Sequence, residues 1–435
     1  MRVIAYLLMA VGFLEAGVSG QAVADSSSGL QPSLRDFARR VQVARAQIPE
    51  IIRSAEAAAE RKVKHPEALL NIPYSRQPSF AEELLNRSGG LAEALPSEER
   101  PALVTGDDMV LFSIRSWERD GAAGMAYLKE CREKGWMTIV FASRAGRPED
   151  LAVDFFVDNG AASGSETHAA VNTAANALHG WIWVCEYVAA LTRLGRHPGI
   201  LQSITTAGSS VHNAKYQNRQ TRHRHYACET AVPAGDLAQI YLQRVDRLVS
   251  DLSGPVIQTQ VARAAGLIAD RIRSGGKVFV STVTHIMLNE MDKNIKTPWI
   301  ALHMLGNAEK TLKTHVKPGD LFFWLGYNGV SVWFFPEASG PSRLFLDYVR
   351  PLSEARVDLI ACFARDPLHP ENNVPDALVH IEQPWDFGDA EVPVPFPPGR
   401  MAPVSGLCQA LLYRMLDEEA SSRLVSGSGQ SAFRP

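Results

Sequence analysis

Several features that would mark this 435-residue chain for a specialised class are missing. Its 44 Lys and Arg nearly balance its 47 Asp and Glu, and the net charge of −3 gives no reason to expect nucleic acid or an anionic membrane as a partner. Its five cysteines are odd in number and widely spaced, so they favour small core residues over a disulfide framework. Beyond the N-terminus, no apolar run is long enough to predict a membrane helix.

The two ends of the chain differ in composition from the rest. Arg2 precedes an apolar run at 3–11, small residues follow, and Ala22-Val23-Ala24 offers an A-x-A-like cleavage site. This layout predicts a signal peptide over residues 1–24 and an exported protein, either periplasmic or extracellular. A buried N-terminal segment is the alternative. We expect residues 25–33 to form a flexible linker and the Ser/Gly-rich residues 421–435 a disordered tail.

A short phrase occurs twice in the chain. Gly106-Asp107 runs into the apolar stretch 109–112, and Gly319-Asp320 runs into the apolar stretch 321–324. Each phrase predicts a tight turn before a strand buried on both faces, as in parallel sheets. Each also follows a long helical pattern and a shorter strand-like run. The sequence therefore predicts two related α/β units in tandem, at 34–200 and 236–420, joined by a polar, basic surface loop at 201–235.

Three further segments carry recognisable patterns. Residues 83–91 read E-x-x-x-R-S-G-G-L, residues 158–164 read D-N-x-x-x-x-G, and residues 235–242 read G-x-L-A-x-x-Y-L. In this order and spacing they resemble the SIS (sugar isomerase) domain family over most of residues 34–420. The resemblance implies two flavodoxin-like parallel-sheet α/β sandwich domains in tandem, a small sugar or sugar derivative as ligand, and no cofactor. It also implies a homodimer, or one chain whose two units imitate a dimer.

The ligand-binding residues are expected in the loops that follow the strands. Open parallel sheets bind ligands at the carboxyl ends of their strands, and in the resembled family hydroxyl-rich turns hold a phosphate there. The candidates are Arg87, Ser113, Arg115, Ser116, Asp158, Asn159, Ser281, Thr282, Thr284 and Asn328. The usual glycine is missing from the loop after 109–114, so an unphosphorylated sugar or a modified glycoside fits better than a phosphosugar. Asp158 and Asn159 can instead form Asx-turns, and Arg87 can instead pair with a carboxylate.

Acid–base chemistry on a sugar needs a base near a carbon-bound proton and an acid near the oxygen. The candidate catalytic residues are Glu83, His285 and Glu290, while Glu82 is expected to cap a helix with Ser79. A packed, hydrogen-bonded histidine is the alternative for His285. The predicted function is carbohydrate binding, with isomerase or lyase activity on a sugar. The alternative is a non-catalytic sugar-binding or sensing protein with eroded phosphate loops.

The connecting loop contains an H-x-H pair, His223 and His225, with His212 and Cys228 nearby. Such a pair binds zinc when further ligands close the site, but this spacing matches no closed pattern. Neighbouring arginines also repel a cation, so we predict no metal site. The positive charge of the loop would suit an acidic sugar.

Overall fold

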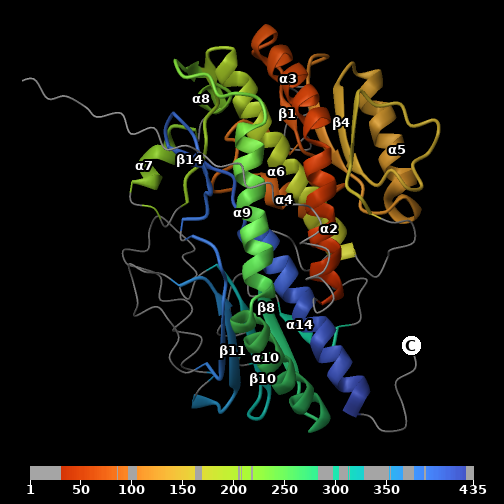
Figure 1. Ribbon diagram of the computed structural model, residues 1–435, viewed down its shortest axis with the longest axis vertical. Coiled ribbons are helices and arrows are strands. Elements are labelled where there is room, and N and C mark those ends of the chain that lie inside the picture. Colours follow the sequence, from red (N-terminus) through yellow and green to blue (C-terminus); the bar gives the residue numbers. More distant parts are fainter. Residues whose placement is uncertain are drawn as a thin grey trace, which may run out of the picture.

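The structure, a computed structural model, contains two α/β units, which lie in the upper and lower halves of the molecule in Figure 1. It describes residues 31–85, 87–96, 105–161, 169–203, 206, 208–216, 219–282, 297–302, 312, 314–327, 352, 354–365, 377–386 and 388–427.

The first unit is built on a five-stranded parallel sheet with the order β2-β1-β3-β4-β5. Its strands are β1 (Leu70–Asn71), β2 (Ala94–Leu95), β3 (Met109–Ser113), β4 (Met137–Ala142) and β5 (Phe155–Asp158). Its helices are α2 (Pro32–Ala46), α3 (Ile48–Lys64), α4 (Pro78–Leu84), α5 (Trp117–Glu133) and α6 (Ala169–Arg193). Strand β3 is apolar except for its last residue and is buried throughout, as expected for a strand covered on both faces.

The second unit repeats this plan. Its parallel sheet has the order β9-β8-β10-β11-β12, so both sheets place their strands in the flavodoxin-like order 2-1-3-4-5. The strands are β8 (Val278–Thr282), β9 (Ile300–Leu302), β10 (Leu321–Leu325), β11 (Asp358–Phe363) and β12 (Val379–Glu382). The helices are α9 (Asp236–Ser253), α10 (Pro255–Arg273) and α14 (Ser405–Gly427). The tandem flavodoxin-like fold predicted from the sequence is therefore confirmed.

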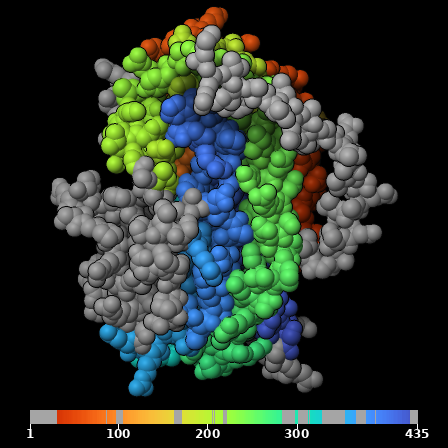
Figure 2. All heavy atoms as spheres, turned by 60° about the vertical axis from the view of Figure 1, so that its left-hand side comes forward, coloured from red at the N-terminus to blue at the C-terminus, as the bar shows by residue number. Residues whose placement is uncertain are grey.

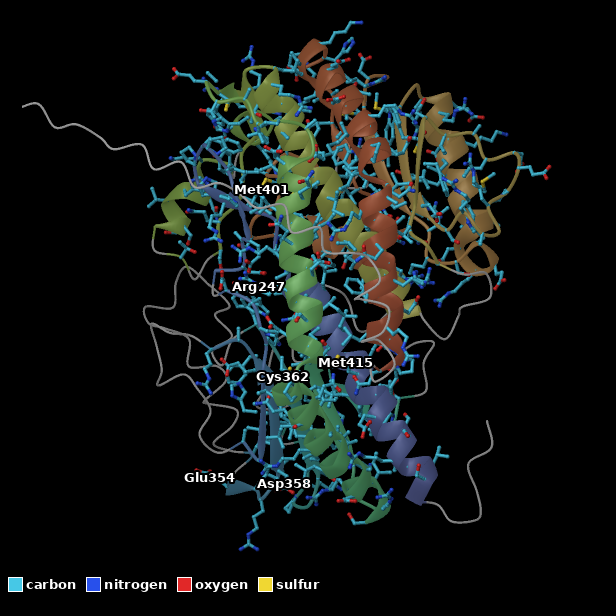
Figure 3. The ribbon with its side chains drawn as sticks, in the orientation of Figure 1. Arg247, Glu354, Asp358, Cys362, Met401 and Met415 are labelled. Atoms are coloured by element: carbon cyan, nitrogen blue, oxygen red, sulfur yellow. The ribbon has the colours of Figure 1, made fainter. Side chains whose placement is uncertain are left out.

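The carboxyl ends of the second sheet point toward the first unit. Figure 3 shows Asp358, at the start of β11, near the lower end of the molecule, and Cys362 close to its middle. Met401, in the short strand β14 (Arg400–Met401), lies farther up, beside the first unit. Residues after β12 thus cross from one unit to the other, and β13 (Val392–Pro393) pairs with β14 there. The proline-rich segment 393–403 contains β14 and the last residue of β13.

One apolar core joins both units, because α6 is buried almost from end to end. Trp181, Trp183 and Leu191 on α6 belong to the same cluster as Phe323 on β10 and Leu411 on α14. Helices α9 and α14 both contact α6, while α14 also contacts α10. Glu186 on α6 accepts hydrogen bonds from the backbone N–H groups of Gly235 (2.9 Å) and Ala238 (3.1 Å), so a residue of the first unit caps the opening helix of the second.

Several local predictions need correction. The long helical pattern that opens the first unit forms two helices, α2 and α3, because Pro49 follows the break at Gln47. The predicted capping pair of Ser79 and Glu82 is not formed: α4 begins at Pro78 after Gln77, and Glu82 accepts a hydrogen bond from the Tyr74 hydroxyl at 2.5 Å. Residues 421–427, assigned to the disordered tail, continue α14.

The connecting segment lies against the first unit and also touches the C-terminal part of the chain. It contains α7 (Ser209–Ala214), α8 (Arg219–Arg222) and β7 (Tyr226–Ala227), which pairs with β6 (Arg196–His197). The His197 ring stacks on Phe396 at a centroid distance of 4.2 Å. Figure 2 shows the C-terminal residues (blue) lying between this segment (lime) and α9 (green).

Candidate functional site

The loop after β3 holds three predicted ligand residues, and the structure shows what each one contacts. Ser113 is buried, and its backbone N–H donates to the side chain of Gln77. Arg115 forms a bidentate ion pair with Asp120, with Nε–Oδ2 and Nη2–Oδ1 distances of 3.0 and 3.2 Å. Ser116 precedes α5 as its N-cap without a side-chain capping bond. The loop therefore sits at a helix N-terminus, a position that favours polar ligands.

The end of β5 supplies two more predicted residues, and both form Asx-turns. Asp158 Oδ1 accepts from the N–H of Gly160 at 3.0 Å, and Asn159 Oδ1 accepts from the N–H of Ala161 at 2.9 Å. Asn159 is also fully buried, and its amide donates to Asn176 Oδ1 at 2.8 Å. The alternative interpretation of this pair, as turn-forming residues, thus describes their contacts.

A polar stripe on α6 faces these loops. Asn172, Asn176 and His179 are spaced four and three residues apart, so they share one side of the helix. Asn172 Nδ2 donates to Arg115 O at 2.9 Å, and Asn176 Nδ2 donates to Ile114 O at 3.4 Å. This stripe, together with Ser113, Arg115, Ser116, Asp158, Asn159 and Arg40 of α2, is called the strand-end site below.

Three buried polar atoms of the strand-end site have no hydrogen-bond partner within the described part of the chain: Asn172 Oδ1, His179 Nε2 and Arg40 Nη1. The Nδ1 atom of His179 lies 2.7 Å from Ala175 O, and a carbonyl can only accept, so Nδ1 carries the proton and Nε2 presents a lone pair. Burial lowers the pKa of His179 to about 4, which keeps the ring neutral at pH 7. The site therefore has two unused acceptors and one unused donor.

This set of atoms suits hydroxyl groups better than a phosphate. A hydroxyl both donates and accepts, so it can satisfy Asn172 Oδ1, His179 Nε2 and Arg40 Nη1 in turn. A phosphate dianion only accepts at neutral pH and would leave the two acceptors unsatisfied. The N-terminus of α5 also carries Glu118 and Asp120 in its first turn, so carboxylates already occupy the position where an anion would gain most.

Glu83 and Arg87, predicted as base and ligand residue, lie together at the contact between the two units. Arg87 pairs with Glu83, and its Nη2 donates to Asp389 Oδ2 at 2.9 Å and to the hydroxyl of Ser405. These four residues, called the inter-unit cluster below, are each at most 2% exposed. The second oxygen of Glu83 accepts from Trp181 Nε1 at 3.0 Å. The pairing of Arg87 with carboxylates matches the alternative interpretation, and the catalytic role of Glu83 stays a prediction.

The structure describes only two of the candidate site residues in the second unit, Ser281 and Thr282. Ser281 is buried on β8, and its hydroxyl has no partner among the residues that the structure describes. Strand alternation puts Ser281 on the same face as Phe279, the face away from α14, while Thr282 ends the strand half-buried. Thr284, His285, Glu290 and Asn328 lie outside the described residues.

Sequence reasoning missed the side chains that complete the strand-end site. Asn172, Asn176 and His179 interrupt an otherwise apolar helix at helical spacing, and that interruption was the available signal. Arg40 gave no comparable signal, because an arginine in an Ala/Arg-rich helix is usually exposed, whereas Arg40 is fully buried against Asp36.

The described residues contain no group of three or more His, Cys, Asp or Glu side chains placed to hold a metal ion. No helix in the described ranges has the length and apolar character needed to span a membrane.

No family model matches this chain, and no curated protein matches it. Among solved structures, the C-terminal domain of glucosamine-fructose-6-phosphate aminotransferase from Francisella tularensis is 10% identical at a TM-score of 0.47, covering 94% of this chain and 99% of that chain. A proposed sugar binding protein from Salmonella typhimurium LT2 is 11% identical at a TM-score of 0.49, covering 90% and 98%. A phosphoheptose isomerase from Francisella tularensis is 13% identical at a TM-score of 0.32, covering 44% and 100%. These likenesses are too distant to carry a substrate or an activity over to this chain.

Proposed function

We propose that this protein binds an unphosphorylated carbohydrate at the strand-end site of its first unit. The observation that carries the proposal is the group of unused buried polar atoms at Asn172, His179 and Arg40. Buried polar atoms are almost always hydrogen-bonded, so unused ones gathered at the carboxyl edge of a parallel sheet indicate a polar ligand. The motifs that resemble SIS domains favour a sugar. Export, proposed from residues 1–24, agrees with a ligand that carries no phosphate.

Sugar isomerisation is a second candidate, favoured by the state of His179. A neutral imidazole with an unused lone pair can accept a proton, and an unused Arg40 N–H can stabilise the negative oxygen that develops. Asp158 lies within electrostatic reach of both side chains and favours the protonated ring once the proton has moved. Turnover would need a substrate carbon next to His179 Nε2.

The test of binding is a thermal-shift and calorimetric titration with a panel of free hexoses, amino sugars and uronates, each matched by its phosphorylated form. We expect one or more unphosphorylated sugars to raise Tm and the phosphorylated partner to act more weakly. The Asn172→Leu variant should lose most of this response. The matched control is Asn213→Leu in α7, which removes an equivalent amide that bonds Gln202 in the connecting segment and should leave binding unchanged.

The test of turnover uses the His179→Gln variant, because glutamine keeps polar atoms in the site but does not exchange protons near neutral pH. If the protein isomerises a sugar that it binds, this variant should bind that sugar with similar affinity and lose turnover by at least about 100-fold. Full activity of the variant would exclude His179 as the base. Binding without turnover in the unmodified protein would leave carbohydrate binding as the function, and no binding across the panel would refute the proposal.

A further inference from the structure

The inter-unit cluster brings together residues that are distant in the sequence. Glu83 lies in the last turn of α4 and Arg87 follows the helix, whereas Asp389 and Ser405 lie about 300 residues later. The approach is close: a Cβ atom on Gly406 would lie only 2.2 Å from Glu83 Oε2 and would displace the Glu83 carboxyl. The backbone also pairs across the contact, with the Ala402 N–H donating to Gly89 O at 2.9 Å.

The charges of the cluster do not balance. Two carboxylates, Glu83 and Asp389, share the single guanidinium of Arg87, and all three groups are buried. Burial makes such a surplus negative charge costly. The cluster can remove this cost by binding one proton.

The hydrogen bonds decide which carboxylate takes the proton. Asp389 accepts from four donors: Arg87 Nη2, the Ser405 hydroxyl at 2.6 Å, and the N–H groups of Val404 (3.2 Å) and Ser405 (3.1 Å). The two backbone donors lie at the N-terminus of α14, which favours a negative charge. Glu83 accepts only from Trp181 and Arg87 in the described structure. A negative charge is therefore better hydrogen-bonded on Asp389 than on Glu83, so Glu83 is the carboxyl that takes the proton.

The other titratable groups around Glu83 supply no compensating charge. They are Tyr241 on α9, whose hydroxyl donates to Pro403 O at 2.8 Å, Cys185 on α6 and Tyr327 after β10. Burial raises the pKa of Tyr241 and of Cys185 well above their ordinary values, so both stay neutral across the physiological range. The charges that act on Glu83 are those of Arg87 and Asp389, and Asp389 in turn interacts with the buried Glu391.

We propose that the inter-unit cluster is a proton-linked joint: Glu83 holds a proton when the two units are closed on each other and releases it when the joint opens. Burial raises the pKa of Glu83 from 4.5 to about 7, although Arg87 and Trp181 act in the opposite direction. A carboxyl group whose pKa is raised in the closed state stabilises that state fully below pH 4.5. This contribution is lost as the pH rises toward 7.

Hydrogen exchange at the Ala402 amide measures the opening of the joint directly, because this N–H bonds across it. Relative to the Glu83→Gln variant, which cannot titrate, we expect protection in the wild type to fall by about tenfold per pH unit between about pH 4.5 and 7. The control is Glu82→Gln, which changes the neighbouring carboxylate on the half-exposed side of α4 and should keep the slope of the wild type. Equal slopes in wild type and Glu83→Gln would overturn the proposal.

Two further measurements cover variants that fail to fold. Asp389→Asn keeps an acceptor for the N–H groups of α14 but removes the carboxylate that shares Arg87 with Glu83. It should therefore also abolish the fall of Ala402 protection with pH. Carbon-13 NMR of the wild type, labelled at glutamate carboxyls, needs no variant. A carboxyl resonance that titrates near pH 7 supports the joint, and the absence of any glutamate that titrates above pH 6 refutes it.

Discussion

Two glutamates ten positions apart show how differently the same burial can act. Glu83 and Glu93 are 0% and 1% exposed. Glu83 lies before the turn-rich segment that separates them, and Glu93 lies at its end. Glu83 shares Arg87 with Asp389. Glu93 contacts Lys62 (3.4 Å), His225 (3.0 Å) and the Tyr187 hydroxyl (3.0 Å).

Their acidities move in opposite directions. Burial raises the pKa of Glu83 to about 7. Burial also acts to raise the pKa of Glu93, but His225 and Lys62 outweigh it and bring the pKa to about 2. Burial raises the pKa of both carboxyls, so the side chains around each one decide the direction of the net shift. The four predictions below test this contrast between satisfied and unsatisfied buried groups.

The largest effect is expected from Arg87→Met. This change leaves Glu83 and Asp389 buried without their cation, and removing one partner of a buried ion pair costs about 3–5 kcal/mol. Denaturant unfolding at pH 7 measures the loss. The control is Arg39→Met, which breaks an exposed pair with Asp36 and should cost at most about 1 kcal/mol. Equal costs would mean that the inter-unit cluster does not stabilise the protein through its charge.

Glu93→Gln should cost up to about 3 kcal/mol at pH 7, because the carboxylate is more acidic in the folded chain. A lowered folded pKa gives stability above the ordinary value of 4.5 that disappears as the pH falls to about 2. The stability difference between wild type and variant should therefore shrink on acidification across that range. Glu83→Gln should show the reverse trend, with its benefit growing from pH 4.5 to 7. Parallel curves for the two variants would refute the contrast.

Gly89→Ala should destabilise the turn between the two glutamates by about 2–4 kcal/mol. Gly89 has a φ of +74°, and a Cβ there would lie 2.8 Å from Ala402 N. The control is Gly208→Ala, which has a φ of +79° with nothing within 4 Å of its Cβ, so it should cost about 1–2 kcal/mol. Thermal or denaturant unfolding separates the two, and equal costs would show that contact with Ala402 is unimportant.

The smallest change in stability is expected from Asn172→Leu, within about 1 kcal/mol, because this variant removes an unsatisfied buried acceptor along with one hydrogen bond. Asn176→Leu should cost about 2–3 kcal/mol, since it strips partners from Asn159 and from Ile114 O. Unfolding in the absence of sugar measures both. A larger loss for Asn172→Leu would mean that its carbonyl is already satisfied in solution.

The fold could be predicted because short, uninterrupted apolar runs that follow a turn are typical of strands buried on both faces. The runs 109–112 and 321–324 read as strands covered on both faces, and each became the central strand of a sheet. The edge strands β2 and β9 were missed, since two or three residues are too short to show alternation. The break between α2 and α3 was missed because the residues on both sides of it favour a helix.

The candidate site was harder to predict than the fold. The residues named after strand ends do lie there, but local turns and ion pairs use most of their hydrogen bonds, as at Asp158 and Arg115. Unused polar atoms instead come from α2 and α6, whose positions depend on how distant segments pack. The distant partners of Arg87, Asp389 and Ser405, come from segments more than 300 residues away, and no local pattern carries that information.

Helix α9 opens the second unit in the sequence, yet it packs on α6 and α2, and Glu186 holds its first turn. Cutting the chain at the apparent boundary, residue 235, would strip the cover from one side of α6 and expose a large apolar surface. A fragment that ends at residue 253 would carry that cover with it. The two units are thus interleaved. We expect fragments divided after residue 253 to reassemble, and fragments divided at residue 235 to give insoluble protein.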